Sequence, residues 1–334
     1  MSIAYHGGDV WQGASPRDYL DFSANLNPEG PPEWVRAAML EGLEHARWYP
    51  DPRDARAIEG LGAFLGLPEA CLMLTGGGID AVALAAALPV GGGHVIAEPT
   101  FQEYGRCCRE WRGVRREELM DYVPEPGDCL WVCNPNNPTG DALSRAEMLA
   151  LLARVEAAGG RLVADEAFID YCPEHSVRDM VMGHPALTVL GSLTKVLAIP
   201  GVRLGWMAAH PSVIEALRAQ ATPWRLNCVA AAVAAALPGH DADFARIRAL
   251  NAARRAAFAR ALGGVGAAVH HSEANFLLCD FDRDMRPAIE LLRAQRILVR
   301  PCGMFPGLNH GHVRLCVRTE TENEALVAAI RQIL

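Results

Sequence analysis

The sequence lacks the segments that mark a membrane or secreted protein. It has no run of about 18 uncharged apolar residues, so it predicts no transmembrane helix. Its N-terminus, Met1-Ser-Ile-Ala-Tyr-His, shows no charged region followed by an apolar stretch and predicts no signal peptide. The 10 cysteines include no Cys-x-x-Cys pair, which disfavours a zinc site, and several lie in apolar, strand-like runs. We therefore expect reduced, buried thiols, no bound metal and a cytoplasmic protein.

Basic charge is also scarce. The formal net charge is −8, whereas nucleic-acid-binding surfaces are usually basic, so we expect no nucleic-acid partner. A small anionic substrate is still possible, because arginines in a binding site can attract it whatever the net charge of the protein. Hydrophobic residues make up 51% of the 334 residues and charged residues 21%, enough for a large core and about two domains.

The order of predicted elements divides the chain into three parts. Residues 45–238 alternate strands and helices, which predicts a large α/β domain. Residues 239–334 follow an α+β pattern and predict a smaller domain. Residues 1–44 are rich in Gly, Asn and Pro before a short amphipathic helix, and we expect them to form an N-terminal arm and part of the small domain.

One loop concentrates reactive side chains. The apolar run at 186–190 predicts a strand, and Ser192, Thr194, Lys195 and Arg203 follow it among small or apolar neighbours. An amine, two hydroxyls and a guanidinium could hold an aldehyde cofactor that carries a phosphate, with Lys195 as the Schiff-base lysine. A surface loop with an ordinary lysine explains this stretch, taken alone, equally well.

A glycine turn and an aromatic pair follow two earlier strands. Gly77 and Gly78 lie between a strand at 71–74 and a helix, where free N–H groups and the helix dipole favour an anion. Such turns often need glycine for geometry alone. Phe101 and Tyr104 follow the next strand; either could stack on a planar ring or belong to the core.

Two further polar residues end predicted strands. Asn137 lies in Asn134-Pro-Asn-Asn-Pro-Thr-Gly140, in which the prolines force extended backbone. Asp165 follows an apolar strand, and a carboxylate there needs a cation. A protonated ring nitrogen would serve, although a salt bridge to an arginine stays open. Together the five features predict a pyridoxal phosphate site: Lys195 for the aldehyde, Asp165 for the ring nitrogen, Asn137 for the ring phenolate, and Gly77, Gly78, Ser192, Thr194 and Arg203 for the phosphate.

The motifs Pro-Asn-Asn-Pro-Thr-Gly, Asp-Glu-Ala-Phe and Ser-Leu-Thr-Lys…Arg-Leu-Gly resemble those of the fold type I pyridoxal-phosphate enzymes of the aminotransferase class I/II family, over nearly the whole chain. The resemblance implies an α/β fold: a large domain with a mostly parallel seven-stranded sheet between helices, and a smaller α+β domain. It is nearest to the branch that holds the histidinol-phosphate aminotransferases and the threonine-phosphate decarboxylases of cobalamin biosynthesis. The His-Gly-Gly-Asp…Asp-Phe-Ser-Ala-Asn-Leu-Asn-Pro segment and Ile-Leu-Val-Arg-Pro-Cys are similar to the decarboxylases.

The chain also departs from its relatives at three positions. The aminotransferases usually carry tyrosine at the position of Phe168 and serine at that of Thr194. In this family Gly76-Gly77 would more often be Gly-Asn, which weakens the assignment of the phosphate loop.

The decarboxylase resemblance implies conversion of L-threonine O-3-phosphate to (R)-1-amino-2-propanol O-2-phosphate and carbon dioxide. Arg314 would bind the substrate carboxylate, and Arg300 with His6 its phosphate. Arg300 could instead be a surface strand residue, and His6 an unattached terminus. The remaining candidate substrate contacts are Gly7, Ser23, Asn25 and Asn137.

Members of this fold usually form homodimers with shared active sites, so the resemblance implies a homodimer in which Tyr49 reaches the partner's cofactor phosphate. The main alternative activity is that of a histidinol-phosphate aminotransferase. A non-catalytic pyridoxal-phosphate sensor and a nicotinamide dehydrogenase are disfavoured, the first because Lys195, Asp165 and Asn137 are all present. The second is disfavoured because Thr75-Gly-Gly-Gly78 lacks the GxGxxG spacing.

Overall fold

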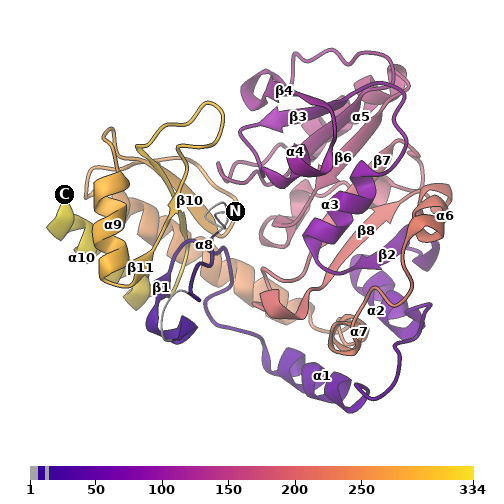
Figure 1. Ribbon diagram of the computed structural model, residues 1–334, viewed down its shortest axis with the longest axis horizontal. Coiled ribbons are helices and arrows are strands. Elements are labelled where there is room, and N and C mark those ends of the chain that lie inside the picture. Colours follow the sequence, from indigo (N-terminus) through magenta and orange to yellow (C-terminus); the bar gives the residue numbers. More distant parts are fainter. Residues whose placement is uncertain (1–6, 12–14) are drawn as a thin grey trace.

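The computed structural model describes residues 7–11 and 15–334, and its centre is a seven-stranded sheet (Figure 1). The strand order is β2-β8-β7-β6-β5-β3-β4. Only β8 runs antiparallel to its neighbours, so the sheet is mostly parallel, as predicted. The strands are β2 (Leu72–Thr75), β3 (His94–Glu98), β4 (Trp111–Arg115), β5 (Cys129–Cys133), β6 (Arg161–Asp165), β7 (Leu187–Ser192) and β8 (Gly205–Ala209).

Helices cover both faces of this sheet. Alternate strand residues divide between two apolar clusters; Leu130 and Val132 face one, while Trp131 faces the other. The first face is covered by α2 (Ala55–Leu65), α5 (Arg145–Ala157) and α7 (Cys228–Ala235), and the second by α3 (Gly78–Ala86), α4 (Glu103–Cys107) and α6 (Pro211–Gln220). Burial on both faces explains why the central strands are continuously apolar.

A second, four-stranded sheet is built from the C-terminal third of the chain. Its antiparallel order is β12 (Arg300–Pro301), β13 (His312–Cys316), β10 (Phe276–Asp280), β9 (Ala268–Val269). Helices α8 (Asp241–Gly263), α9 (Arg286–Ala294) and α10 (Glu320–Ile333) pack with it.

The N-terminal segment packs beside this second sheet and forms a separate two-stranded sheet. Strand β1 (Leu20–Asp21) pairs in parallel with β11 (Ile297–Leu298), and Phe22 is fully buried in the same apolar cluster as Phe258. The first and last parts of the chain therefore pack together. The domain boundaries at 44/45 and 238/239 remain predictions.

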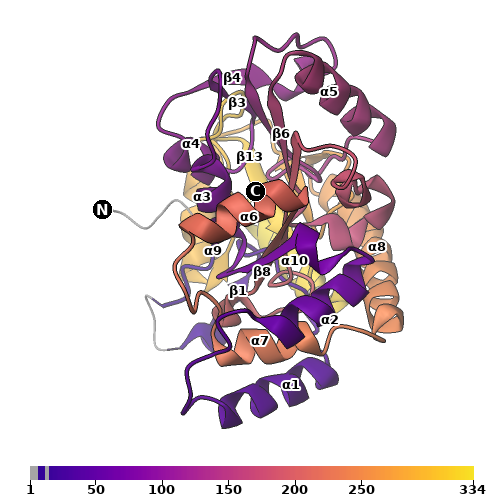
Figure 2. The ribbon, with the colours of Figure 1, turned by 90° about the vertical axis from the view of Figure 1, so that its right-hand side faces the viewer.

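Helix α1 (Glu33–Glu44) ends the first segment of the predicted division. Residues 1–44 were expected to belong to the arm and the small domain, but α1 lies beside α7 (Figures 1 and 2). Val35 and Ala38 join the apolar cluster of the seven-stranded sheet. A Cβ at Gly42 would lie 2.7 Å from the Cα atom of Val229, so glycine permits this close approach.

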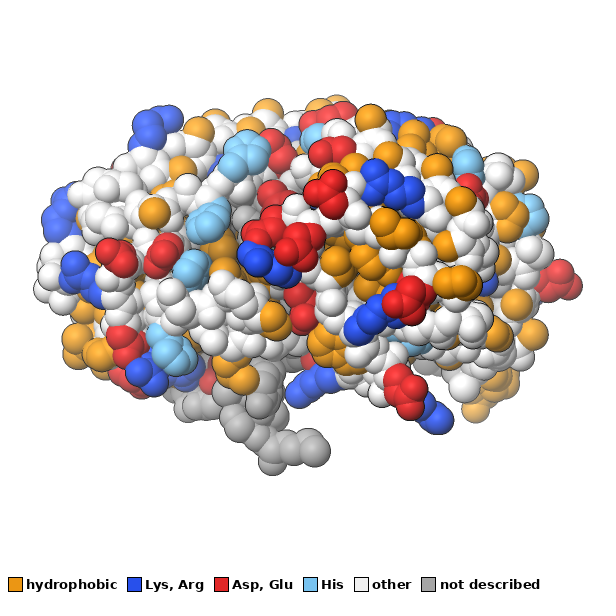
Figure 3. Space-filling model, turned by 90° about the horizontal axis from the view of Figure 1, so that it is seen from above, with side chains coloured by type: hydrophobic (Ala, Val, Ile, Leu, Met, Phe, Trp, Pro, Cys, Tyr) orange, Lys and Arg blue, Asp and Glu red, His pale blue; other side chains and the backbone are white. Residues whose placement is uncertain are grey.

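Two further observations concern the surface charge and the character of the helices. On the face shown in Figure 3, acidic and basic side chains are interspersed rather than gathered by sign. Among the helices of the described residues, none has the length and apolar character that a membrane crossing needs.

Glu166, directly after β6, is a buried acid that joins the sheet to the following loop. One carboxylate oxygen accepts a hydrogen bond from the Ser176 hydroxyl at 2.6 Å and the other from the Val177 N–H at 2.8 Å. Burial is the main cause that raises the pKa of Glu166 from 4.5 to about 7. Its contribution to folding is therefore complete below pH 4.5 and is lost as the pH rises through about 7.

Replacing Glu166 by Gln removes this titration while keeping a polar side chain. The raised pKa corresponds to about 3 kcal/mol of stability lost by the wild type across this range. We expect the fall in Tm between pH 5 and pH 8 to be smaller in E166Q than in the wild type by at least about 2 °C. Glu174→Gln, at a side chain that is 68% exposed, is the control and should follow the wild type. Equal falls in E166Q and the wild type would contradict the assignment.

Candidate active site

A cavity of about 740 Å³ lies at the carboxyl ends of the parallel strands and is bounded on its other side by β12, β13 and the N-terminal segment. Parallel α/β sheets place ligands at this edge. Most of the predicted site residues line the cavity: Gly7, Ser23, Asn25, Gly78, Tyr104, Asn137, Asp165, Ser192, Thr194, Lys195, Arg203, Arg300 and Arg314. Gly77 adjoins it through Arg203. His6 lies outside the described residues.

Lys195 follows strand β7 and is the only lysine in the sequence. Its backbone carbonyl accepts the N–H of Asn27 at 3.0 Å, which ties the lysine loop to the N-terminal segment. Burial, with the neighbouring charges of Arg203 and Arg314, lowers the pKa of Lys195 to about 8. A substantial fraction of this amine is thus neutral, and hence nucleophilic, slightly above neutral pH.

Asp165 ends strand β6 and is 7% exposed. Its Oδ2 atom accepts a hydrogen bond from the Tyr104 hydroxyl at 2.6 Å, and its Oδ1 atom accepts one from the Ala167 N–H at 2.9 Å. Burial raises the pKa of Asp165, while these two hydrogen bonds and the charge of Lys195 oppose that rise. No ion pair joins Asp165 to a cation of the described residues, so the salt bridge left open by the sequence is not formed.

Asn137, after β5, meets Arg314 of β13. Arg314 donates one hydrogen bond to the Asn137 side-chain oxygen and another, at 2.7 Å, to the Ser23 carbonyl. Its Nε atom is buried and has no hydrogen-bond partner among the described residues, and burial lowers the pKa of Arg314 to about 10. These two hydrogen bonds fix the guanidinium at the cavity wall.

The N-terminus of α3 faces two hydroxyls and an arginine. Ser192 and Thr194 share a hydrogen bond of 2.8 Å, and a Cβ at Gly78 would lie 3.5 Å from the Ser192 Cβ. Gly77 has φ 94° and ψ 171°, a backbone conformation essentially restricted to glycine. A Cβ at Gly77 would lie 2.8 Å from the Arg203 Cζ atom. Arg203 occupies the space that a side chain at position 77 would need, which accounts for glycine in place of the expected asparagine.

Arg300 lies opposite Arg314 in the β12–β13 pair. It is 7% exposed, its guanidinium carbon lies 5.6 Å from the centre of the Phe305 ring, and burial lowers its pKa. Arg300 is thus not a surface residue. Two buried guanidinium groups on neighbouring strands create a strongly anion-attracting wall.

Several cavity residues were not assigned from the sequence. Phe305, Gln102, Val10 and Trp11 line the cavity, and Asp21 does so while accepting the Ser23 hydroxyl at 2.5 Å. Asp21 and Phe305 lie inside or beside motifs that carry the family resemblance, but their types gave no chemical signal. A stronger signal lay in the composition, because a chain with a single lysine points to that residue directly.

The residues fit pyridoxal phosphate. The buried Asp165 carboxylate forms no ion pair with a described residue and can take a protonated ring nitrogen. Lys195 offers an amine with a lowered pKa for the aldehyde. The α3 N-terminus, Ser192, Thr194 and Arg203 offer the donors that a phosphate needs.

Comparison with known proteins supports the same conclusion. The family model for aminotransferase class I and II matches residues 17–330. Threonine-phosphate decarboxylase of Salmonella typhimurium is 34% identical, over 98% of this chain and 96% of the relative. A histidinol-phosphate aminotransferase of Methanoculleus marisnigri is 29% identical, over 93% and 90%. The solved structure of L-threonine-O-3-phosphate decarboxylase from Porphyromonas gingivalis superimposes with a TM-score of 0.85 at 26% identity, covering 93% of this chain and 98% of that one. The chain therefore belongs to the aminotransferase class I and II family.

Proposed function

We propose that the chain decarboxylates L-threonine O-3-phosphate to (R)-1-amino-2-propanol O-2-phosphate and carbon dioxide, as a step of cobalamin biosynthesis. The observation that carries the proposal is the pair Arg300 and Arg314, buried opposite each other beside Lys195. Threonine phosphate carries two anionic groups, a carboxylate and a phosphate, whereas histidinol phosphate carries one. The similarity to threonine-phosphate decarboxylases of two organisms supports the same choice.

The large-sheet side of the cavity would hold the cofactor. Lys195 would hold the aldehyde carbon, Asp165 the ring nitrogen, Asn137 the phenolate oxygen, and Gly77, Gly78, Ser192, Thr194 and Arg203 the phosphate. Tyr104 or Phe101 would cover the ring. When bound, pyridoxal phosphate supplies an electron sink for the bond that breaks at the substrate α-carbon.

The small-sheet side would orient the substrate and thereby select the bond. Arg314 would take the carboxylate, because it lines the cavity and its Nη atoms are fixed by Asn137 and Ser23. Arg300 and His6 would take the phosphate, with Gly7, Ser23 and Asn25 completing the subsite. A carboxylate held in one place by the sheet-anchored Arg314 can leave, whereas the α-hydrogen cannot occupy the same position.

Lys195 would also donate the proton that replaces the carboxylate at the α-carbon. Its pKa of about 8 lets the amine gain and lose a proton near neutral pH. Lys195 would then be the basic group of the cavity that delivers a proton to the substrate α-carbon. The neighbouring Arg203 and Arg314 disfavour its charged form and so favour release of that proton.

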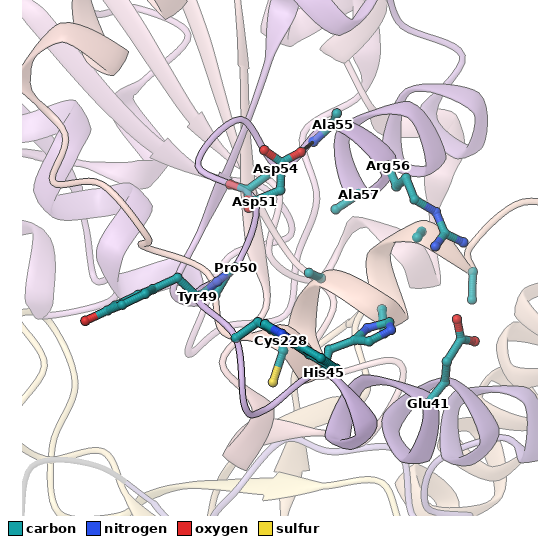
Figure 4. Close-up of a pocket in the computed structure, with 15 residues that line it drawn as sticks. Glu41, His45, Tyr49, Pro50, Asp51, Asp54, Ala55, Arg56, Ala57 and Cys228 are labelled. Carbon is teal, nitrogen blue, oxygen red and sulfur yellow. Dashed lines mark hydrogen bonds between the residues drawn. The ribbon is translucent and has the colours of Figure 1, made fainter.

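A homodimer would complete the site. Five exposed apolar side chains, between 50% and 82% exposed, gather at the end of α1 and on two loops: Leu40, Leu43, Trp48, Tyr49 and Trp224. The Tyr49 and Trp224 rings lie 4.9 Å apart, beside a cavity of about 380 Å³ between α1, α2 and α7. Figure 4 shows the Tyr49 hydroxyl directed away from these helices. A second copy seated there would bury this surface and bring Tyr49 to its cofactor phosphate.

The location we propose is the cytoplasm. All ten cysteines are free, and the pKa of each thiol in the strands β5 and β10 is raised by burial. Such thiols are stable in a reducing compartment.

The decarboxylation itself is tested by carbon dioxide release. Purified protein with pyridoxal phosphate and threonine phosphate should release carbon dioxide without any 2-oxo acid. The control reaction contains histidinol phosphate and 2-oxoglutarate and should give no glutamate. Turnover of histidinol phosphate that depends on 2-oxoglutarate, without carbon dioxide from threonine phosphate, would show an aminotransferase instead.

The role of Arg314 has a matched control in Arg318. Arg318 donates to the Asp21 carbonyl at 3.0 Å and to Glu322 at 2.6 Å and does not line the cavity. Loss of a bidentate contact should lower kcat/KM for threonine phosphate by about 100-fold in Arg314→Lys. Arg318→Lys should change it by less than about fivefold. Similar losses in both variants would remove Arg314 from the substrate site.

The dimer and Tyr49 are tested together. Sedimentation should give twice the mass of one chain at micromolar concentration. Tyr49→Phe should keep that mass but raise the dissociation constant of pyridoxal phosphate by about 10-fold, because one hydrogen bond to a charged group is lost. Tyr122→Phe, which loses a bond to Asp128 within the chain, should leave this constant unchanged. A monomer, or equal constants in the two variants, would contradict the shared site.

A further inference from the structure

Tyr104 is bound to Asp165 by the shortest hydrogen bond that this carboxylate accepts. The hydroxyl donates to Oδ2 at 2.6 Å, whereas the Ala167 N–H reaches Oδ1 at 2.9 Å. Each carboxylate oxygen therefore accepts one bond from the protein, and each keeps capacity for a second. A charge-assisted bond of this length is among the stronger contacts in a protein interior.

The surroundings of Tyr104 fix its ring and place its hydroxyl between the Asp165 carboxylate and the Cys133 thiol. The residue is 0% exposed. Its ring packs 5.4 Å from the Trp131 ring, and the Phe101 ring meets it edge-on at 5.6 Å, with an interplanar angle of 83°. Cys133, the register partner of Asp165 in the β5–β6 pair, ends the neighbouring strand. Aromatic packing thus fixes the phenol in the position from which it reaches Asp165.

The direction of proton donation is fixed as well. Burial, and then the charge of Asp165, raises the pKa of Tyr104 well above its ordinary value, so the phenol keeps its proton at working pH. Burial alone favours the neutral form of Asp165, and the Tyr104 hydrogen bond opposes that effect. A neutral Asp165 could not balance a protonated ring nitrogen.

We propose that Tyr104 is a positioning residue: its hydroxyl holds the Asp165 carboxylate in one orientation and in its charged form, ready for the protonated ring nitrogen of the cofactor. This role rests on the proposed cofactor site and differs from the ring stacking expected for Tyr104. Phe101, which lines the cavity with its side chain half-buried, is then the aromatic available for stacking. The contact joins residues 61 positions apart, from α4 and β6, so it also links two elements beneath the cofactor.

The experiment uses the full-length holoenzyme and Tyr104→Phe, which removes only the hydroxyl. We expect the acid limb of the pH dependence of kcat, and of the cofactor absorbance without substrate, to move upward by about one pH unit. The dissociation constant of pyridoxal phosphate should rise by about 10-fold. Tyr171→Phe is the matched control, because Tyr171 is a buried tyrosine that does not line the cavity. Lys195→Ala gives the absorbance baseline, since no other lysine can bind the aldehyde.

Asp165→Asn separates positioning from general packing. In that background the acid limb should be absent, and adding Tyr104→Phe should change the cofactor constant by less than about twofold. The proposal would be overturned if Y104F showed an unshifted acid limb and an unchanged dissociation constant of pyridoxal phosphate. It would also be overturned if Y104F and Y171F changed both quantities equally.

A second measurement needs only folded wild type and D165N. Their infrared difference spectrum at pH 7 should lack the band of a protonated carboxylic acid; its presence would contradict a charged Asp165. The absorbance and infrared measurements use no substrate. A negative result in them would therefore overturn the role of Tyr104 without affecting the decarboxylation proposal, and a negative carbon dioxide assay would not affect the role of Tyr104.

Discussion

The carboxylate of Asp165, buried at the end of a central strand with no ion pair to a described residue, is the constraint on which the site depends. A charge in that position is costly unless a partner of opposite sign is supplied. The described residues supply two hydrogen bonds and the more distant charge of Lys195, so a ligand with a cationic atom suits this position. The parallel sheet then brings Asn137 and Lys195, from the ends of neighbouring strands or the loops after them, to the same edge. A ring with a basic nitrogen, a phenolate and an aldehyde matches these three groups.

The opposite wall of the cavity has the reverse character. Arg300 and Arg314 are buried side by side, each with a pKa lowered by burial. Two guanidinium groups so placed attract anions, so this side of the cavity suits a ligand with acidic groups. The N-terminal segment shares in this wall, because Arg314 is fixed by the Ser23 carbonyl and β1 pairs with β11. In the proposed function, the cofactor and the acidic groups of the substrate are therefore held by different sheets.

Much of this could be predicted from the sequence. A polar residue directly after an apolar strand has to lie at the edge of a parallel sheet, so Asp165 and Asn137 were predictable as neighbours. The position of α1 could not be predicted. An amphipathic pattern shows that one face of a helix is buried, but it does not show which element covers that face. The close contact of Gly42 with α7 is visible only in the structure. The Tyr104 hydroxyl was likewise unpredictable, because its bond to Asp165 depends on how α4 packs on the sheet. The glycine at position 77 became intelligible only with its dihedral angles and the place of Arg203.

The central claim is that the carboxylate, and not the α-hydrogen, leaves the substrate. The most direct measurement uses threonine phosphate deuterated at the α-carbon, with mass spectrometry of the product and of the recovered substrate. We expect an aminopropanol phosphate whose former α-carbon keeps the deuterium and carries one new hydrogen from water. Loss of the deuterium to water, with the carboxylate still in place, would contradict it.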